Sequence, residues 1–301
     1  PVIDGRIVAL NKTDGTKVWE VQIADPGKSE TITGAPLIVK DMVVTGMAGA
    51  EYGVRGWIEA LDLKTGKRRW RTYTIPAPGE PGSETWKDKH GAWKTGGGTT
   101  WVTGSYDPEL NVIIWGTANP GPDWDNAYRP GDNLWTDSTI ALDADSGKIK
   151  WGFQHTPNDP YDYDSIAENT FVDTQINGAF RRATLHANRN GYAYALDRKT
   201  GEPLWCTQFV QELNWSGGLD SKCKPKSYDP KKDVQTYMPG TAAARGTATK
   251  GRGTVEGTLK PGHMGGKNWP PTSYSPQTNR YYIPTIDGCN KAFNEVAIPG
   301  E

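Results

Sequence analysis

The sequence predicts an all-β protein whose strands form the blades of a β-propeller. Three observations lead to this prediction. A short strand–turn–strand motif occurs four times, the chain is rich in glycine (36), proline (22) and tryptophan (13), and no long stretch has the 3.6-residue apolar period of an amphipathic helix. Glycine and proline adopt the backbone angles that tight turns require. Repeats of β type at irregular intervals indicate propeller blades that carry insertions.

The four copies of the first repeat read ALNKTDGTKVW, ALDLKTGKRRW, ALDADSGKIKW and ALDRKTGEPLW, beginning at Ala9, Ala60, Ala141 and Ala195. In each copy an Ala-Leu pair ends an apolar strand, an Asp or Asn follows, and a glycine lies four residues before a tryptophan. The Asx side chain caps a tight turn and the glycine takes positive φ. Each copy therefore predicts two antiparallel strands, with a tryptophan at a fixed place on the second.

A second repeat surrounds Trp101 and Trp269. Each tryptophan lies four residues before a serine, and each segment continues as Ser-Tyr-x-Pro-x-x-Asn into an alternating β strand. The segments KTGGG and HMGGK precede them, and glycine lets a backbone pass close to another group. Two interpretations stay open: the tryptophans pack in the core, or they form the floor and wall of one central pocket.

Charge argues against a nucleic-acid partner, and hydropathy argues against a membrane-spanning helix. The formal net charge is -1 over 301 residues, whereas a nucleic-acid-binding protein normally carries a basic surface. No apolar run approaches the roughly 20 residues that a helix needs to span a bilayer. Because the chain starts with Pro1 rather than methionine, we expect a leader or a longer N-terminal region before it.

The three cysteines do not form a CxxC metal motif. Cys206 and Cys223 flank a turn-rich segment, so a local disulfide and two free thiols are both compatible with the sequence. Cys289 is the third cysteine, without a partner in this pattern. We favour an oxidising compartment.

Oxygen-bearing side chains occur in three separate loops. Glu51 lies in GAEYGVRG, Asn119 in GTANPGP, and Asp162 and Asp164 in DPYDYDS. In an extended segment the two aspartates would share one side, because side chains alternate with period two. Carboxylate and amide oxygens suit Ca²⁺ or a trivalent ion, whereas histidine and cysteine are too scattered for a zinc site. Taken singly, each acidic residue is also compatible with a solvated loop charge.

Four longer segments carry a family resemblance: GAEYGVRGWIEALDLKTGKRRW, GTANPGPDWDNAYRPGDNLW, FQHTPNDPYDYDS and HANRNGYAYALDRKTGE. In this order, over nearly the whole chain, they resemble the pyrroloquinoline quinone (PQQ)-dependent alcohol dehydrogenases of the methanol and ethanol dehydrogenase type. The resemblance implies an eight-bladed β-propeller with tryptophan-docking motifs. Because that family's catalytic subunits are much longer, we expect residues 1–301 to be a fragment of one propeller domain with about five blades and an insertion at about 206–262.

The resemblance also implies a set of site residues. Asp162 matches the catalytic base, and Arg189 matches the basic residue that hydrogen-bonds the reactive carbonyl of the quinone. The positions matching metal ligands are Glu51, Asn119, Asp162 and Asp164. The positions matching cofactor contacts are Thr33, Gly49, Ala50, Trp101, Arg189, Asn268 and Trp269.

Asp164 bears on the choice of metal. An acid two residues after the base resembles the lanthanide-using branch of the family, so the implied cofactors are PQQ with Ca²⁺ or a lanthanide, the lanthanide being favoured. A trivalent ion carries one more positive charge, which the added carboxylate offsets, whereas beside Ca²⁺ the same acid would raise a carboxylate pKa. The alternative is a turn-capping Asp164 that points outward.

The resemblance implies oxidation of a primary alcohol to an aldehyde in the periplasm, with electrons passed to a cytochrome c; a homodimer stays open. The segment includes no CxxCH haem-attachment motif, and it does not include the family's adjacent-cysteine pair, whose usual position would precede Pro1. Two alternatives are a non-catalytic propeller scaffold of the outer-membrane assembly type and a carbohydrate-binding propeller. Neither requires the acidic positions or Arg189.

Overall fold

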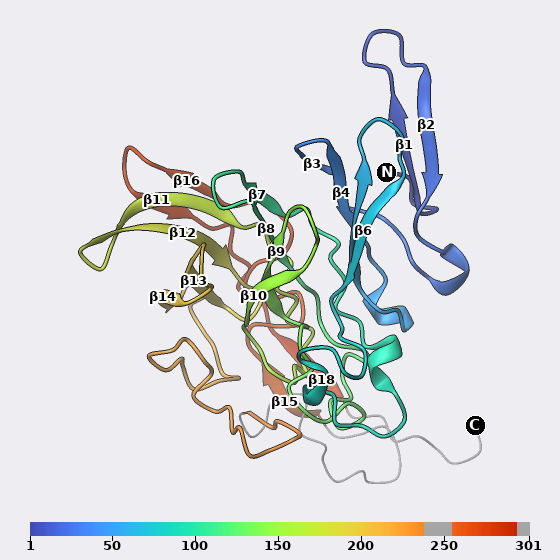
Figure 1. Ribbon diagram of the computed structural model, residues 1–301. Helices are drawn as coiled ribbons and strands as arrows, with labels where there is room; N and C mark the ends of the chain where they lie inside the picture. The colour runs from blue at the N-terminus through green and yellow to red at the C-terminus, as the bar shows by residue number, and fades with distance from the viewer. Residues whose placement is uncertain (238–254, 294–301) are drawn as a thin grey trace.

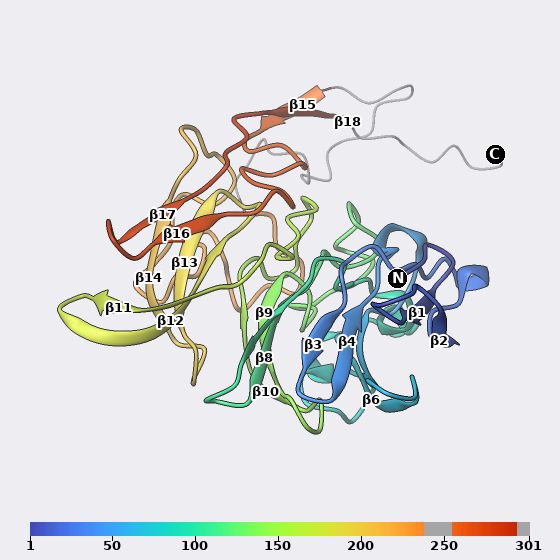
Figure 2. The same ribbon diagram turned by 90° about the horizontal axis from the view of Figure 1, so that it is seen from above.

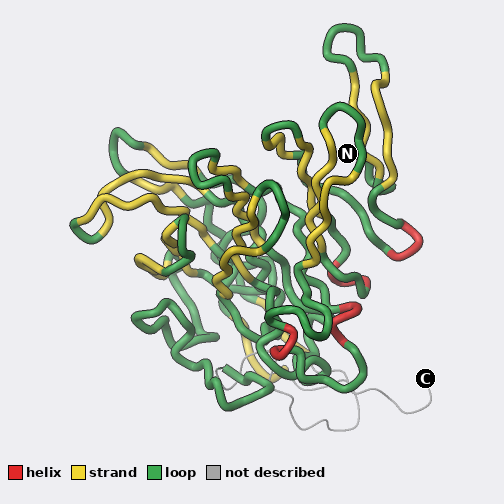
Figure 3. The backbone as a smooth tube through the Cα atoms, in the orientation of Figure 1, coloured by secondary structure: helices red, strands yellow, loops and turns green. Residues whose placement is uncertain are grey.

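The computed structural model describes residues 1–237 and 255–293, and these residues are almost entirely strands and loops. Four short 3-10 turns, shown red in Figure 3, are the helical elements of this part: η1 (Pro26–Lys28), η2 (Ala50–Tyr52), η3 (Ser83–Thr85) and η4 (Ala92–Thr95). Within the described ranges no helix has the length and apolarity that crossing a bilayer would need. The all-β prediction is confirmed.

Three four-stranded antiparallel sheets follow one another along the chain and stand next to one another in that order (Figures 1 and 2). The first contains β3 (Leu37–Val39), β4 (Met42–Gly46), β5 (Trp57–Asp62) and β6 (Arg68–Tyr73). The second contains β7 (Ser105–Asp107), β8 (Val112–Gly116), β9 (Ser138–Asp143) and β10 (Ile149–Gln154). The third contains β11 (Thr170–Ile176), β12 (Ala179–Ala187), β13 (Tyr192–Asp197) and β14 (Pro203–Gln208).

Three two-stranded pairs complete the described part. They are β1 (Arg6–Leu10) with β2 (Lys17–Gln22), β16 (Ser273–Ser275) with β17 (Arg280–Tyr282), and β15 (Val255–Leu259) with β18 (Asn290–Phe293). Each four-stranded sheet is a simple meander, as a propeller blade is. The expected number of about five blades stays a prediction.

The first repeat forms the four predicted hairpins, at β1–β2, β5–β6, β9–β10 and β13–β14. In each turn the glycine N–H donates to the Asx carbonyl over 2.8 Å, and the glycine φ lies between 69° and 76°. Asp62 shows the capping: its Oδ1 accepts hydrogen bonds from the N–H groups of Lys64 and Thr65, at 3.1 and 2.9 Å. The turn chemistry is therefore as predicted.

The repeat tryptophans join one hairpin to the next. Trp70 Nε1 donates to the carbonyl of Ala144, 3.2 Å away, and a Cβ added to Gly147 would lie 2.5 Å from the Trp70 ring. Trp19 covers Gly66 and Trp151 covers Gly201 in the same way. The repeat glycine is thus needed twice, for its positive φ and for the tryptophan that docks on it.

The second repeat also forms equivalent hairpins. Ser105 pairs with Ile114 in β7–β8, and Ser273 pairs with Tyr282 in β16–β17, in matching registers. The asparagine that ends each motif has left-handed backbone angles, with φ of 52° at Asn111 and 50° at Asn279. Asparagine tolerates this region better than most residues with a Cβ, so the motif sets the turn.

Cys206 and Cys223 form a disulfide, and Cys289 is a free, exposed thiol. The disulfide lies in the segment 206–262, for which residues 238–254 are outside the described ranges. Trp215 and Tyr237 of this segment are buried against Tyr161 and Tyr163. We retain as a proposal that residues 206–262 are an insertion in a single domain.

Two buried histidines stack between the second and third sheets, with ring centroids 4.9 Å apart. His155 follows β10 and its Nε2 lies 3.0 Å from Thr139 Oγ1 on β9, while His186 on β12 has its Nε2 3.2 Å from Asn188 Nδ2. Burial lowers the pKa of both rings, that of His186 to about 4. The positive charges of Lys224 near His155 and of Lys267 near His186 act in the same direction, while Glu168 opposes it at His186.

We expect the contribution of His186 to the free energy of unfolding to decrease as the pH falls from about 6.5 towards 4, while the raised pKa values of buried carboxylates such as Asp159 and Asp162 act in the opposite direction. In that window the unfolded chain binds protons that the folded protein excludes, so the contribution is present above pH 6.5 and is lost below it. For His186, whose pKa falls to about 4, the loss is on the order of 3 kcal/mol. Urea titrations of the wild type and of a His186→Gln variant across this range measure the effect.

The matched control is His90→Gln, at an exposed histidine. It should keep the pH dependence of the wild type, whereas His186→Gln should differ from the wild type by the contribution of His186, on the order of 3 kcal/mol between pH 6.5 and 4. Equal slopes for all three proteins would contradict the prediction.

Candidate functional site

The site lies where several connections meet at one end of the three sheets. In an antiparallel meander, the start of each odd strand and the end of each even strand lie at the same end. The segment before β7 carries Trp101, the β8–β9 connection carries Asn119, the β10–β11 connection carries Asp162 and Asp164, and the β12–β13 turn carries Arg189. Chain topology therefore gathers residues that are far apart in sequence.

Asp164 is at the centre of this group and is 3% exposed. Its Oδ1 accepts a hydrogen bond from the backbone N–H of Asn119 over 2.7 Å. Its Oδ2 accepts one from Trp101 Nε1 over 3.0 Å and forms an ion pair with Arg189 Nη2 over 2.8 Å. The alternative of an outward-pointing, turn-capping Asp164 is therefore wrong: the carboxylate faces the site and binds three separate segments.

Arg189 lies between the two aspartates. Its Nη1 is 3.1 Å from both the carbonyl oxygen and Oδ1 of Asp162, and its Nε is buried without a hydrogen-bond partner. The guanidinium carbon is 5.8 Å from the centre of the Trp101 ring. The carbonyl of His263 accepts a further hydrogen bond from Nη1 over 3.4 Å. The resemblance-based grouping of Trp101, Asp162, Asp164 and Arg189 is thus spatially coherent.

Asp162 has a φ of 61°, so the segment is not a regular extended strand and the expectation of period-two alternation is wrong at this position. The two carboxylates nevertheless share one side because both bind Arg189. Burial raises the pKa of Asp162, and the negative charge of Asp164 raises it further, while Arg189 opposes both. Without another cation the pair therefore resists carrying two negative charges.

Asn119 has a buried Oδ1 with no hydrogen-bond partner, while its Nδ2 donates to Asp123 Oδ1 over 2.7 Å. Burial raises the pKa of Asp123 to about 6, and the charge of Glu51 contributes. Sequence reasoning did not single out Asp123. The sequence feature that could have identified Asp123 is its place in the same Gly/Pro-rich loop as Asn119, in the run GPDWD.

Glu51 is exposed on the η2 turn, and its link to the group is electrostatic, through Asp123. Gly49 and Ala50 precede it and are buried; a Cβ on Gly49 would lie 2.4 Å from the carbonyl oxygen of Ser29. Thr33 is exposed, and its Oγ1 donates to the carbonyl of Trp101 over 3.2 Å. Of the four predicted metal ligands, Asn119 contacts Asp164 directly and Asp162 is linked to Asp164 through Arg189, whereas Glu51 makes neither kind of contact with them.

The two remaining predicted residues, Asn268 and Trp269, lie shortly after His263, whose carbonyl accepts a hydrogen bond from Arg189. Asn268 is buried and its Nδ2 donates to the carbonyl of Met264 over 3.1 Å, whereas the Trp269 side chain is 62% exposed. The adjacent Lys267 is buried and forms an ion pair with Glu168 over 2.9 Å. Core packing is therefore the wrong interpretation for Trp269, and Trp101 has a polar contact that Trp269 does not share.

The donor set fits a hard cation. Asn119 offers an unpartnered buried carbonyl oxygen. Burial, together with the negative charges of neighbouring carboxylates, raises the pKa values of Asp162 and Asp123, and a bound cation would favour their ionised forms. Within residues 1–237 and 255–293, no three His, Cys, Asp or Glu side chains are already grouped as a metal cage. Arg189 accounts for this, because its guanidinium stands between Asp162 and Asp164 as their present cationic partner.

We expect Gly265→Ala to displace Arg189. Gly265 has a φ of 78°, and an added Cβ would lie 2.5 Å from Arg189 Cβ. Gly178 has the same φ with nothing within 4 Å of an added Cβ, so Gly178→Ala is the matched control. The backbone strain of about 1–2 kcal/mol is common to both, and only Gly265→Ala should lose a further 1 kcal/mol or more, from the clash. Equal unfolding free energies for the two variants would contradict this.

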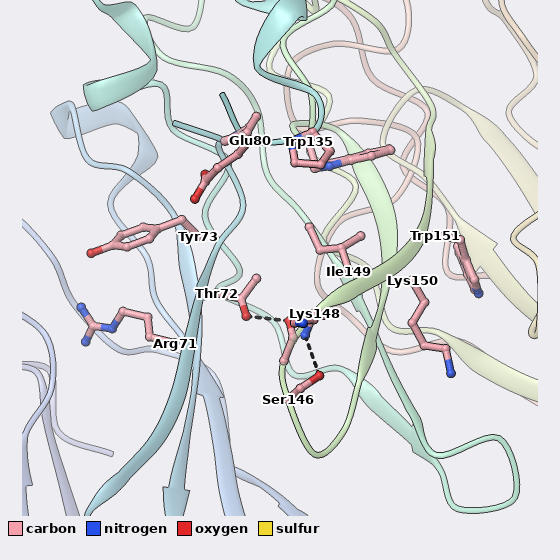
Figure 4. A pocket seen from close by; sticks show the side chains of 13 residues that line it. Arg71, Thr72, Tyr73, Glu80, Trp135, Ser146, Lys148, Ile149, Lys150 and Trp151 are labelled. Carbon is pink, nitrogen blue, oxygen red and sulfur yellow. Dashed lines mark hydrogen bonds between the residues drawn. The ribbon is translucent and has the colours of Figure 1, made fainter. Parts of the chain in front are cut away.

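A pocket of about 740 Å³ lies elsewhere, between the outer strands β6 and β10 (Figure 4). Its labelled lining includes Tyr73, Trp135 and Lys148, and Thr72 Oγ1 bonds the Gly147 carbonyl at its side. No predicted site residue lines it. The candidate site is therefore defined by contacts between loops and is separate from this pocket.

Comparisons with known proteins find relatives of one kind. The family model described as PQQ: glucose/ethanol/alcohol dehydrogenase, β-propeller domain, matches residues 24–233. The lanthanide-dependent methanol dehydrogenase of Methylacidiphilum fumariolicum (strain SolV) is 38% identical over 306 residues, covering 95% of this chain and 47% of that protein. The quinohemoprotein alcohol dehydrogenase of Comamonas testosteroni is 40% identical over 296 residues, covering 93% and 39%.

Among solved structures, a europium-containing methanol dehydrogenase matches with a TM-score of 0.82 and 36% identity, covering 94% of this chain and 49% of that one. The match agrees with the predicted β-propeller class. The chain spans about half the length of such relatives or less.

Proposed function

We propose, from the premise that this chain belongs to the PQQ-dependent alcohol dehydrogenase family, that the full-length protein is an alcohol dehydrogenase that uses PQQ and a hard cation. The observation that carries the proposal is the buried group centred on Asp164, where Trp101, Asn119 and Arg189 bind one carboxylate. A scaffold propeller needs the docking repeat but has no use for a buried and a half-buried aspartate that share one arginine.

The residues fit both cofactors. Asn119, Asp162 and Asp164 would hold the cation, with Glu51 as a further carboxylate from the η2 turn, and Trp101 and Arg189 would face PQQ. Thr33, Gly49, Ala50, Asn268 and Trp269 are the remaining proposed cofactor positions. When bound, PQQ supplies the two-electron acceptor for the hydride of the alcohol C–H bond, and the cation supplies Lewis-acid polarisation.

Asp162 is the proposed base. Without a cation, burial and Asp164 raise its pKa, while Arg189 Nη1 and a bound cation would both favour its ionised form, which is the form that accepts a proton. An ionised Asp162 would accept the hydroxyl proton at a carboxylate oxygen as the C–H bond breaks. Arg189 is the proposed hydrogen-bond donor to the oxygen that gains negative charge, because its guanidinium carries several N–H donors and a positive charge.

The finer points of the proposal follow the named relatives. Lanthanide-dependent methanol dehydrogenases are among them, and with Asp164 inside the site we propose a lanthanide in preference to Ca²⁺. We propose a primary alcohol as substrate, a cytochrome c as electron acceptor and the periplasm as location. A homodimer belongs to the same proposal.

The test is dye-coupled alcohol oxidation by the purified full-length protein, reconstituted with PQQ and either Ca²⁺ or La³⁺. Activity that requires both PQQ and a cation is the expected result. A folded protein that binds neither, shown by PQQ absorbance and metal analysis, would refute the proposal and favour the scaffold alternative.

A further inference from the structure

Arg129 is a fully buried arginine that the proposed reaction does not use. It lies in the β8–β9 connection, the same connection that carries Asn119. Burying a guanidinium away from water costs several kcal/mol unless its donors are satisfied and its charge is offset. Its contacts therefore indicate a specific role.

The guanidinium joins two loops through hydrogen bonds. Nε donates to the carbonyl of Pro122 and Nη2 to that of Asp123, each over 3.0 Å, within the loop of Asn119. Nη2 also donates to the carbonyl of Asp159, in the loop that continues to Asp162 and Asp164. One side chain thus holds together the two segments that carry the proposed metal ligands.

A second layer fixes Arg129 itself. Nη1 donates to Asn133 Oδ1 over 2.9 Å, and Asn133 Nδ2 donates back to the carbonyl of Arg129 over 2.9 Å. Asn158 Nδ2 donates to the same carbonyl over 3.1 Å. The arginine is therefore anchored at both its backbone and its guanidinium, as a rigid connection requires.

The hydrogen bonds of the guanidinium go to three backbone carbonyls and one amide. The carboxylate of Asp159 instead accepts the backbone N–H groups of Tyr161 and Tyr163, at 2.8 and 2.6 Å. Burial lowers the pKa of Arg129 to about 10, against the opposing charges of Asp159, Asp137 and Asp123, so it stays positive at neutral pH. It is an internal cation beside an acidic site.

We infer that Arg129 is a positioning residue that sets the separation of the Asn119 loop and the Asp162–Asp164 loop, and thereby the cation affinity of the site. The inference rests on the proposed function. Lysine cannot replace arginine here, because one ammonium nitrogen cannot reach four acceptors that the planar guanidinium contacts in different directions.

The experiment compares Arg129→Lys and Asn133→Ala with the wild-type full-length protein. La³⁺ and Ca²⁺ dissociation constants are measured by calorimetric titration, together with the free energy of unfolding of the metal-free protein. Arg129→Lys keeps the positive charge but loses the planar guanidinium and most of its hydrogen bonds. We therefore expect both dissociation constants to rise about 10- to 100-fold, as for other groups that orient metal ligands. Asn133→Ala removes only one contact of the guanidinium and should raise them less.

The matched control is Arg198→Lys, at a second buried arginine. Arg198 pairs with Asp107 and Asp173, away from both ligand loops. It should lose stability while its dissociation constants stay within about twofold of the wild type.

Two results would overturn the inference. One is wild-type affinity in Arg129→Lys, or in Asn133→Ala if Arg129→Lys does not fold. The other is an equal loss of affinity in Arg198→Lys, which would mean that general destabilisation explains the effect. A folded wild type that binds neither ion would refute the proposed function, and this inference with it.

Discussion

Replacing Asp162 with asparagine should lower kcat by a factor of about 10³ or more, measured at saturating La³⁺, PQQ and alcohol. Asparagine has nearly the size of aspartate but cannot accept the hydroxyl proton. It also tolerates the left-handed backbone of this position, where φ is 61°, better than alanine does. The chemical step should therefore fail while the loop keeps its shape.

Cofactor content provides the control for this variant. PQQ absorbance and bound metal should remain at wild-type stoichiometry at saturation, although the metal dissociation constant rises because one ligand charge is lost. Arg189 keeps Asp164 as its ionic partner, so the site retains an anchored guanidinium. Retention of more than a tenth of the wild-type kcat would rule out Asp162 as the base.

The second large effect concerns metal choice. We expect Asp164→Asn to reduce La³⁺-supported kcat/KM about 10- to 1000-fold more than Ca²⁺-supported kcat/KM. At about 4 Å, the third positive charge of a lanthanide interacts with one carboxylate by about 1–4 kcal/mol, depending on the local dielectric. Parallel titrations of the variant with both ions measure this difference.

Asp164 is also a structural anchor, so its variant needs a control that removes contact without removing charge. Trp101→Phe deletes the 3.0 Å hydrogen bond from Trp101 Nε1 to Asp164 Oδ2 and leaves the carboxylate in place. It should reduce activity with both ions by the same factor. If Asp164→Asn also affects both ions equally, Asp164 orients the site and does not select the metal.

The hairpins and their joins were predictable from sequence because each depends on a few neighbouring residues. Asp62, Gly66 and Trp70 specify a cap, a positive φ and a docking ring within nine positions. The same holds for the turn at Asn111, where the motif and the backbone angle agree. Local chemistry of this kind needs no knowledge of the rest of the fold.

The glycine run before Trp101 shows the limit of predictions from local sequence. It suggested close approach of the backbone to another group, and that group is the protein itself. A Cβ on Gly96 would lie 2.5 Å from the Trp86 ring, and one on Gly97 would lie 2.6 Å from the Asn119 carbonyl oxygen. The sequence thus predicts that another group packs closely against these glycines, but it does not predict which group that is.

The sequence by itself determined the β class, the turn positions and the docking tryptophans, and the family resemblance predicts Trp101, Asn119, Asp162, Asp164 and Arg189 as site residues. Only the tertiary structure decided that Asp164 faces inward, that Glu51 lies away from the other predicted ligands, that Cys206 bonds Cys223, and that Asp123 and Arg129 contact the loops of the proposed site. The physical reason is the separation along the chain of the residues that interact. Turn formation depends on residues within one hairpin, whereas convergence of loops depends on how separate sheets pack against one another, and a short sequence motif carries no record of that packing.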